Sequence, residues 1–248
     1  MSKKVVKTKD IVVGDIFDTN EGGSVTVIKL LKGGKALIKH NDEFGYEVEV
    51  EKRRLLIGTI KNPYHRSVQG VGYHGVGKYK TQVNKVLDLA YKKWRGMMTR
   101  NYYCDYENRF SSYKDCYVAD EWHNLQTFSA WYYEQVGWDK GFEIDKDLLS
   151  EDGKVYSPET CCLMPREINT AIVSLTNSDS IMGYHERREG VFEVRLRAVA
   201  GSCRSFTDKD EAVKYYKELK KVCLDNLIAK WDGKVDNKVI EKLKSWDF

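Results

Sequence analysis

The segment from residue 143 to residue 162 constrains the fold most, because it combines an acidic strand end, a polar loop and a helix-start signal in that order. Residues 143–147 (Glu-Ile-Asp-Lys-Asp) place carboxylates at the end of a short apolar strand. The following loop contains Gly153, and Ser157 and Pro158 predict an N-cap and a first helical residue, although Pro165 limits such a helix to about one turn. Carboxylate oxygens are ligands for hard divalent cations. The sequence therefore predicts a metal-binding strand, loop and helix in this segment.

Composition places the chain among ordinary globular proteins. Its 248 residues are 42% hydrophobic and 31% charged, which suits one large domain or two to three small ones. No apolar run is long enough to span a bilayer, and the start, Met-Ser-Lys-Lys, lacks the apolar core of a signal peptide. We therefore expect a cytoplasmic protein whose irregularly spaced cysteines are thiols. The net charge of +4 permits nucleic-acid binding if the basic residues gather on one face.

Two segments precede the central block. Residues 1–61 contain short β-type runs separated by Gly-Gly and Asn-Asp pairs, which predict a small β-barrel or a meander. Residues 62–80 form a Gly-rich connector whose Gly70 to Gly75 segment matches a dinucleotide fingerprint in letters. That fingerprint needs a preceding apolar strand, and here the lead-in is a turn. We therefore interpret the segment as a linker and not as a nucleotide site.

The central block, residues 81–176, is expected to be helical at its start. Apolar residues recur at helical spacing, and a second aromatic face follows it. Helical spacing is what a core helix requires, so we assign these side chains to the core rather than to base stacking. The first stripe comprises Val83, Val86, Leu87, Ala90, Trp94, Met97 and Met98, and the second Trp122, Leu125, Phe128 and Trp131 or Tyr132.

The last block, residues 177–248, predicts a compact α+β module. Gly183 to His185, residues 191–197 and residues 201–206 are expected to be three strands, and residues 208–230 a long amphipathic helix. The tail from 232 to 248 is expected to form a short final helix. Arg195 and Arg197 share one face of their strand because side chains alternate, and Arg204 lies on the next strand. These arginines are candidates for DNA contacts, and a solvated basic face explains them about as well.

The central and last blocks resemble known proteins. The central residues are similar to phage-borne HNH-like endonucleases, and the last block looks like the DNA-binding module of plant ethylene-response factors, which phage homing nucleases often carry. The first resemblance is carried by Trp94, Met97, Arg100, Tyr113, Trp122, Phe128, Trp131, residues 144–147, residues 156–161, Pro165 and Asn169. The second is carried by Gly183-Tyr184, Arg195, Arg197 and residues 206–212 (Phe-Thr-Asp-Lys-Asp-Glu-Ala).

The first resemblance implies a ββα-metal nuclease site. It implies that Asp145 and Asp147 bind Mg²⁺ or another divalent cation, with both side chains on one face of the strand, and that Asn169 is a ligand or an orienting group. The sequence departs from the family at Lys146, which stands where active members have the histidine that acts as general base. A protonated lysine stabilises phosphate charge but is a poor base. As alternatives, the two acids cap a helix or a turn, and Asn169 caps the segment that follows it.

Further candidates lie outside this segment. His123 is a candidate substitute base, although a core or surface histidine is the more common case. Arg100, with nearby basic residues of the same helix, is a candidate for contacting the DNA backbone, although such runs usually form a solvated face. A structural Zn²⁺ site would use thiolates, but the sequence has no Cys-x-x-Cys pair. The cysteines considered for it are Cys104, Cys116, Cys161 and Cys162.

Together these observations predict an α+β chain with an N-terminal small β-barrel, a central helical ββα-metal-like domain and a C-terminal three-stranded sheet plus helix. The expected function is that of an Mg²⁺-dependent DNA endonuclease or nickase that binds double-stranded DNA through the C-terminal module. The alternative is a nuclease-fold protein that has lost catalysis and only binds nucleic acid or a host protein. The N-terminal barrel is a candidate surface for a host protein, and a phage-encoded chain would act in the host cytoplasm.

Overall fold

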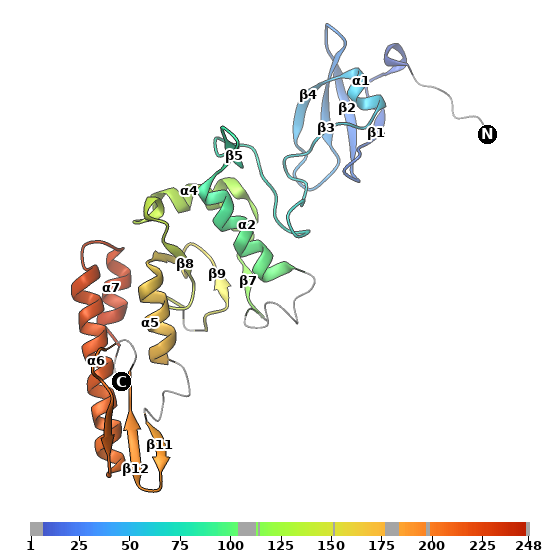
Figure 1. The fold of residues 1–248 in the computed structure, drawn as a ribbon. Helices are drawn as coiled ribbons and strands as arrows, with labels where there is room; N and C mark the ends of the chain where they lie inside the picture. Colours follow the sequence, from blue (N-terminus) through green and yellow to red (C-terminus); the bar gives the residue numbers. More distant parts are fainter. Residues whose placement is uncertain are drawn as a thin grey trace. The chain divides into compact units, whose positions relative to one another are not determined.

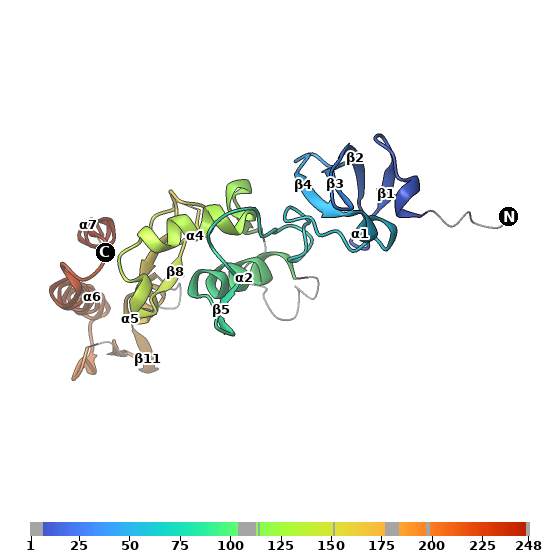
Figure 2. The same cartoon turned by 90° about the horizontal axis from the view of Figure 1, so that it is seen from above.

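The computed structural model describes residues 7–103, 113, 115–150, 152–176, 184–196 and 199–246 (Figures 1 and 2). The chain divides into two compact units, Met1–Tyr103 with Asp120–Phe128, and Cys104–Ala119 with Ser129–Phe248. The first unit combines the predicted N-terminal module, the connector and the first helix of the predicted central block. The architecture is mixed α and β, as the sequence predicts.

The N-terminal part of the first unit is an antiparallel meander. After a short 3₁₀ turn, η1 (Thr8–Asp10), its strands are β1 (Ile16–Asp18), β2 (Ser24–Leu30), β3 (Lys35–His40) and β4 (Glu47–Glu51). They pair in the order β1-β2-β3-β4, and α1 (Lys52–Leu56) follows β4. Among the described residues β1 and β4 are not paired, so the prediction of a closed barrel is wrong and the alternative of a meander is right. Residues such as Val25, Val27 and Ile38 alternate inward and form the core under α1.

The predicted helical stripe of the central block begins later than expected. Asn84 and Lys85 both have positive φ, which makes a two-residue hairpin turn between β5 (Gln82–Val83) and β6 (Val86–Leu87). Val83 and Val86 are consequently 55% and 64% exposed, and the prediction that places them in a core helix is wrong.

The core helix itself is α2 (Leu89–Tyr102), which Asp88 caps by accepting a hydrogen bond from the Tyr91 backbone N–H. Ala90, Trp94, Met97 and Met98 are buried as predicted, whereas Leu87 lies in β6 and is 41% exposed. Trp94 packs in the core and donates its indole N–H to the Trp122 carbonyl at 2.7 Å. Trp122 lies in η3 (Asp120–His123), and α4 (Leu125–Glu134) follows directly.

The glycine connector is held on this core by hydrogen bonds and close packing. Its described residues, 62–80, do not form the strand and helix that a dinucleotide fingerprint requires. Gln126 donates to the carbonyls of His74 (3.1 Å) and Tyr79 (2.9 Å), and it accepts from the Tyr79 N–H at 3.0 Å. Gly72 lies so close to Trp94 that a Cβ there would come within 2.8 Å of the indole ring. Only glycine leaves room for this approach.

This approach makes Gly72→Ala a test of the connector's packing. We expect the variant to lose roughly 1–3 kcal/mol of stability, because the added methyl group must displace a fully buried tryptophan. Gly96→Ala is the matched control, since a Cβ at that helical position meets Arg100 at an ordinary 3.5 Å and alanine favours the helix. Denaturant unfolding monitored by tryptophan fluorescence measures both. Equal stability of Gly72→Ala and the unaltered chain would contradict the packing described here.

The second unit begins with small sheets. A 3₁₀ turn, η4 (Trp138–Lys140), precedes β8 (Glu143–Asp145). β7 (Tyr117–Val118) pairs in parallel with β9 (Val155–Tyr156), and β8 pairs antiparallel with β10 (Cys162–Met164). The helix α5 (Arg166–Thr176) starts directly after Pro165 and lies beside β8 in both views.

The helix predicted at Ser157 is not present. The Ser157 hydroxyl accepts from the Thr160 N–H as expected of an N-cap, but the single turn ends at Cys161 and the chain continues as β10. Thr160 explains the change, because its hydroxyl donates to the Val155 carbonyl and keeps the turn on the preceding strand.

The C-terminal module has three strands followed by a helix, as predicted, but β11 starts where the first predicted strand ends, and β12 and β13 are shorter than predicted. β11 (His185–Arg188), β12 (Val191–Val194) and β13 (Arg204–Phe206) form one antiparallel sheet, and α6 (Lys209–Trp231) and α7 (Asn237–Lys244) follow. Asp208 caps α6 through the N–H groups of Asp210 and Glu211.

The long helix also runs along α5. The Lys220 ammonium donates to the Leu175 carbonyl at 2.9 Å, and at the other end Lys230 pairs with Glu167 at 2.6 Å. No helix in the described parts of the chain has the length and apolar character needed to cross a membrane.

Candidate functional site

The segment from β8 to α5 holds three of the predicted catalytic residues, Asp145, Lys146 and Asn169. Asp145 ends β8 opposite Cys162 of β10, and Asn169 lies half-buried in the first turn of α5. Along the chain, β8 is followed by β9, which pairs with β7, then by β10, which pairs with β8, and then by α5. The chemistry of the segment depends on what the polar side chains contact.

Asp145 is a buried turn carboxylate. It is 4% exposed, and its Oδ1 accepts the backbone N–H groups of Asp147 (3.0 Å) and Leu148 (2.8 Å). Burial raises the pKa of the Asp145 carboxyl, while the same backbone donors act to lower it. This arrangement is an Asx turn that ends the strand, one of the alternatives considered from the sequence.

Asp147 and Lys146 form an ion pair at the next two positions. β8 ends at Asp145, so Asp147 lies beyond the strand, and the expectation that both acids share one strand face is wrong. Asp147 is exposed, and its Oδ1 accepts from the Lys146 ammonium at 2.6 Å. The two carboxylates therefore have different partners, a turn and an ammonium.

Lys146 is held as a cation. Its side chain is buried, and its ammonium also donates to the Gly153 carbonyl and lies 5.8 Å and 5.6 Å from the ring centres of Tyr113 and Tyr156. Burial acts to lower the pKa of Lys146, but the hydrogen bond and charge of Asp147 outweigh it, so the pKa is raised. Lys146 is consequently protonated at neutral pH and is not a general base.

These contacts bear on the predicted metal. In this arrangement Oδ1 of Asp145 accepts from two backbone N–H groups, and Oδ1 of Asp147 accepts from the Lys146 ammonium, so the two acids are held by different partners through these oxygens. The described residues contain no cluster of three or more His, Cys, Asp or Glu side chains with metal-binding geometry. The binding of a divalent cation by Asp145 and Asp147 stays a prediction, and we derive no chemical step through a metal ion.

Of the cysteines considered for zinc, Cys161 and Cys162 are buried thiols. Burial raises the pKa of Cys161 to about 12, and it raises that of Cys162 as well. Cys116 is half-buried and faces the Gly153 carbonyl at 3.9 Å, while Cys104 lies outside the described residues. Zinc binds the thiolate form, so the described thiols give the predicted zinc site no support.

His123 and Arg100 belong to the first unit. The His123 ring lies 3.6 Å from Asp120 through Nδ1 and 3.4 Å from the Tyr102 hydroxyl through Nε2. Arg100 is half-buried in the last turn of α2. These two residues therefore have local contacts in a unit other than that of Asp145.

The C-terminal sheet presents its arginines on two different faces. Phe192 pairs with Phe206, and the Phe206 ring lies 5.2 Å from Tyr215 of α6, so this face packs on the helix. Arg204 shares that face, with its guanidinium 5.5 Å from the Tyr215 ring centre. Arg204 therefore lies on the helix side of the sheet, and Arg197 lies outside the described residues.

The opposite face of the sheet is open and basic. Register places His185, Glu193 and Ser205 side by side on it, and Arg187 joins them through its ion pair with Glu193 at 3.1 Å. Arg188 pairs with Val191, which lies on the same side as Glu193, and exposed Arg195 follows between buried neighbours. The sequence analysis missed Arg187 and Arg188. Arg187 reaches this face through its ion pair with Glu193, and Arg188 through its pairing with Val191 of β12.

Comparison with known proteins gives no further guide. No family model, no curated protein and no solved structure matches this chain.

Proposed function

We propose that this protein binds double-stranded DNA through the open face of its C-terminal sheet. The observation that carries the proposal is the gathering of Arg187 and Arg188 on the face that α6 leaves uncovered, with exposed Arg195 directly after β12. Arginine guanidinium groups bind phosphates and guanine edges, and a small sheet fits the major groove. Glu193 is the acidic side chain placed on that face, and its charge is paired with that of Arg187.

The proposal has a direct test in the salt dependence of binding. A labelled mixed-sequence duplex of about 30 base pairs, titrated with the full chain, is expected to bind with an affinity that falls steeply as salt rises. Three phosphate contacts would give a slope of about −2.7 in log K against log[salt], at about −0.9 per contact. Affinity that does not change with salt would contradict the proposal and would indicate a protein target.

Metal-dependent DNA cleavage is the second candidate, and the succession of β8, β10 and α5 with Asp145 at the strand end favours it. Supercoiled plasmid incubated with the protein and Mg²⁺ or Mn²⁺ distinguishes the two. Binding without nicking supports a role in DNA binding alone. Nicking that Asp145→Asn abolishes, in a variant with an unchanged circular dichroism spectrum, supports cleavage.

A further inference from the structure

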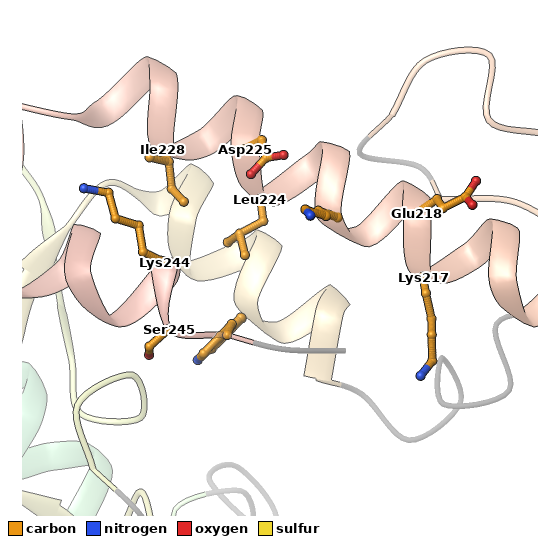
Figure 3. A pocket seen from close by; sticks show the side chains of 9 residues that line it. Lys217, Glu218, Leu224, Asp225, Ile228, Lys244 and Ser245 are labelled. Atoms are coloured by element: carbon orange, nitrogen blue, oxygen red, sulfur yellow. The ribbon is translucent and has the colours of Figure 1, made fainter.

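A pocket of about 560 Å³ lies along α6 from Lys217 to Ile228 and at the end of α7 (Figure 3). Its size is in the range of small-ligand sites. None of its lining residues belongs to the arginine-bearing sheet, so it is separate from the surface proposed above. The pocket is lined by Lys217, Glu218, Lys221, Leu224, Asp225, Ile228, Lys244, Ser245 and Trp246.

The floor of the pocket is apolar and carries an aromatic ring. Leu224 and Ile228 project from α6 toward α7 in Figure 3, and Leu224 is 5% exposed. Trp246 follows α7 and adds an indole to the same lining. An apolar floor with an indole suits a flat ring, since base–aromatic stacking tolerates every base.

The rim of the pocket carries cations. Lys217 and Lys244 lie toward opposite ends of the pocket in Figure 3, and Lys221 is one turn from Lys217 on α6. Lys244 pairs with Glu241 at 3.2 Å, whereas Lys217 and Lys221 have no ion pair among the described residues. The exposed ammonium groups of Lys217 and Lys221 can bind a phosphate, and the indole beside them can stack on a base. Together they suit a nucleotide, in which a phosphate and a base are joined.

We propose that this pocket binds one nucleotide of a single-stranded nucleic acid. Trp246 and the apolar floor take the unpaired base, and Lys217 and Lys221 contact the adjoining phosphates. A duplex does not fit this arrangement, because its bases are stacked inside the helix and cannot stack on the indole of Trp246. The rim carboxylates Glu218 and Asp225 also oppose the dense phosphates of a duplex. This inference does not rest on duplex binding by the sheet.

Fluorescence anisotropy of a labelled single strand of about 12 nucleotides tests the proposal. The full chain is used, with unlabelled duplex present in excess to occupy the sheet. Trp246→Ala is expected to weaken binding about tenfold with the salt slope unchanged, since stacking is lost. Lys217→Gln and Lys221→Gln are each expected to reduce the salt slope by about 0.7, the value for one phosphate of a single strand.

Controls separate these effects from misfolding and from charge alone. Trp246→Phe keeps an aromatic ring and is expected to retain most of the affinity. Lys242→Gln removes an exposed charge of α7 outside the pocket and is expected to leave the salt slope unchanged. Single-strand binding that all three pocket variants leave intact would overturn the proposal. So would competition by free AMP as strong as that by the strand, or complete competition by the duplex.

Discussion

The triple variant Arg187→Gln, Arg188→Gln, Arg195→Gln is expected to bind duplex DNA about 100-fold more weakly than the unaltered chain. All three side chains are exposed, Arg187 and Arg188 on the side of the sheet opposite α6 and Arg195 directly after β12. Each substitution is expected to remove a charge-assisted contact with phosphate or base. At about 1 kcal/mol or more per contact, three losses amount to roughly 3 kcal/mol, which is about two orders of magnitude in affinity. Anisotropy at a fixed salt concentration measures the change.

Arg204→Gln is the matched control for that variant. It removes one positive charge, as does each single substitution in the triple variant, but its guanidinium lies over Phe206 and Tyr215 on the helix side of the sheet. We expect its DNA affinity to stay within about threefold, with a stability loss of about 0.5–1 kcal/mol from the lost cation–π contact. A loss of DNA binding by Arg204→Gln equal to that of the triple variant would show that net charge alone, not the open face, determines binding.

Asp145→Ala is expected to lower the free energy of unfolding by roughly 1–3 kcal/mol. The substitution leaves the N–H groups of Asp147 and buried Leu148 without their acceptor at the end of β8. Asp145→Asn keeps an oxygen in the same place, so it is expected to preserve the turn. Urea denaturation of both variants measures the difference.

The pH dependence of Asp145→Asn adds a second test. Burial raises the folded-state pKa of Asp145 above its ordinary 3.8, so the folded state holds the proton more tightly than the unfolded state. The protonated, neutral form of Asp145 therefore favours the folded state. This contribution to the free energy of unfolding is fully present below pH 3.8 and is lost as the pH rises through the pKa of the folded state. Asp145→Asn is therefore expected to be at least as stable as the unaltered chain at pH 7, with this difference vanishing toward pH 4. Equal destabilisation by the two substitutions at pH 7 would contradict the turn role of Asp145.

Local signals in the sequence predicted part of this fold well. The helix α6 starts where Asp208 provides an N-cap and keeps its apolar side on the sheet and α5, so periodicity and capping agree. The three strands before it were also predictable from alternation and turn residues. Trp94 and Trp122 were assigned to the core from spacing alone, and both are fully buried.

The remaining features depend on contacts that periodicity does not encode. The stripe at Val83 and Val86 fits a helix, but the turn at Asn84 and Lys85 makes it a hairpin. A closed barrel and an open meander have the same strand pattern, since closure depends on whether the first and last strands pair.

The sequence predicted where the residues of the candidate site lie along the chain, but not which groups they contact. Asp145 was identified as a strand-end carboxylate, and it is one. Its burial, and the link from Lys146 to the Gly153 carbonyl, arise only when the loop folds back on the strand. The prediction of the basic residues on the sheet was also incomplete. The positions of Arg187 and Arg188 follow from the pairing of β11 with β12 across a bulge, which the sequence pattern does not reveal.

Photo-crosslinking from the open face tests the central claim most directly. Benzoylphenylalanine in place of Ser205 would stand opposite Glu193 in the middle of the proposed DNA surface, and in place of Lys214 it would stand on exposed α6. The account predicts that a labelled duplex crosslinks to the protein from position 205 and much less from position 214. Crosslinking from 214 alone, or equally from both positions, would contradict DNA binding by this face of the sheet.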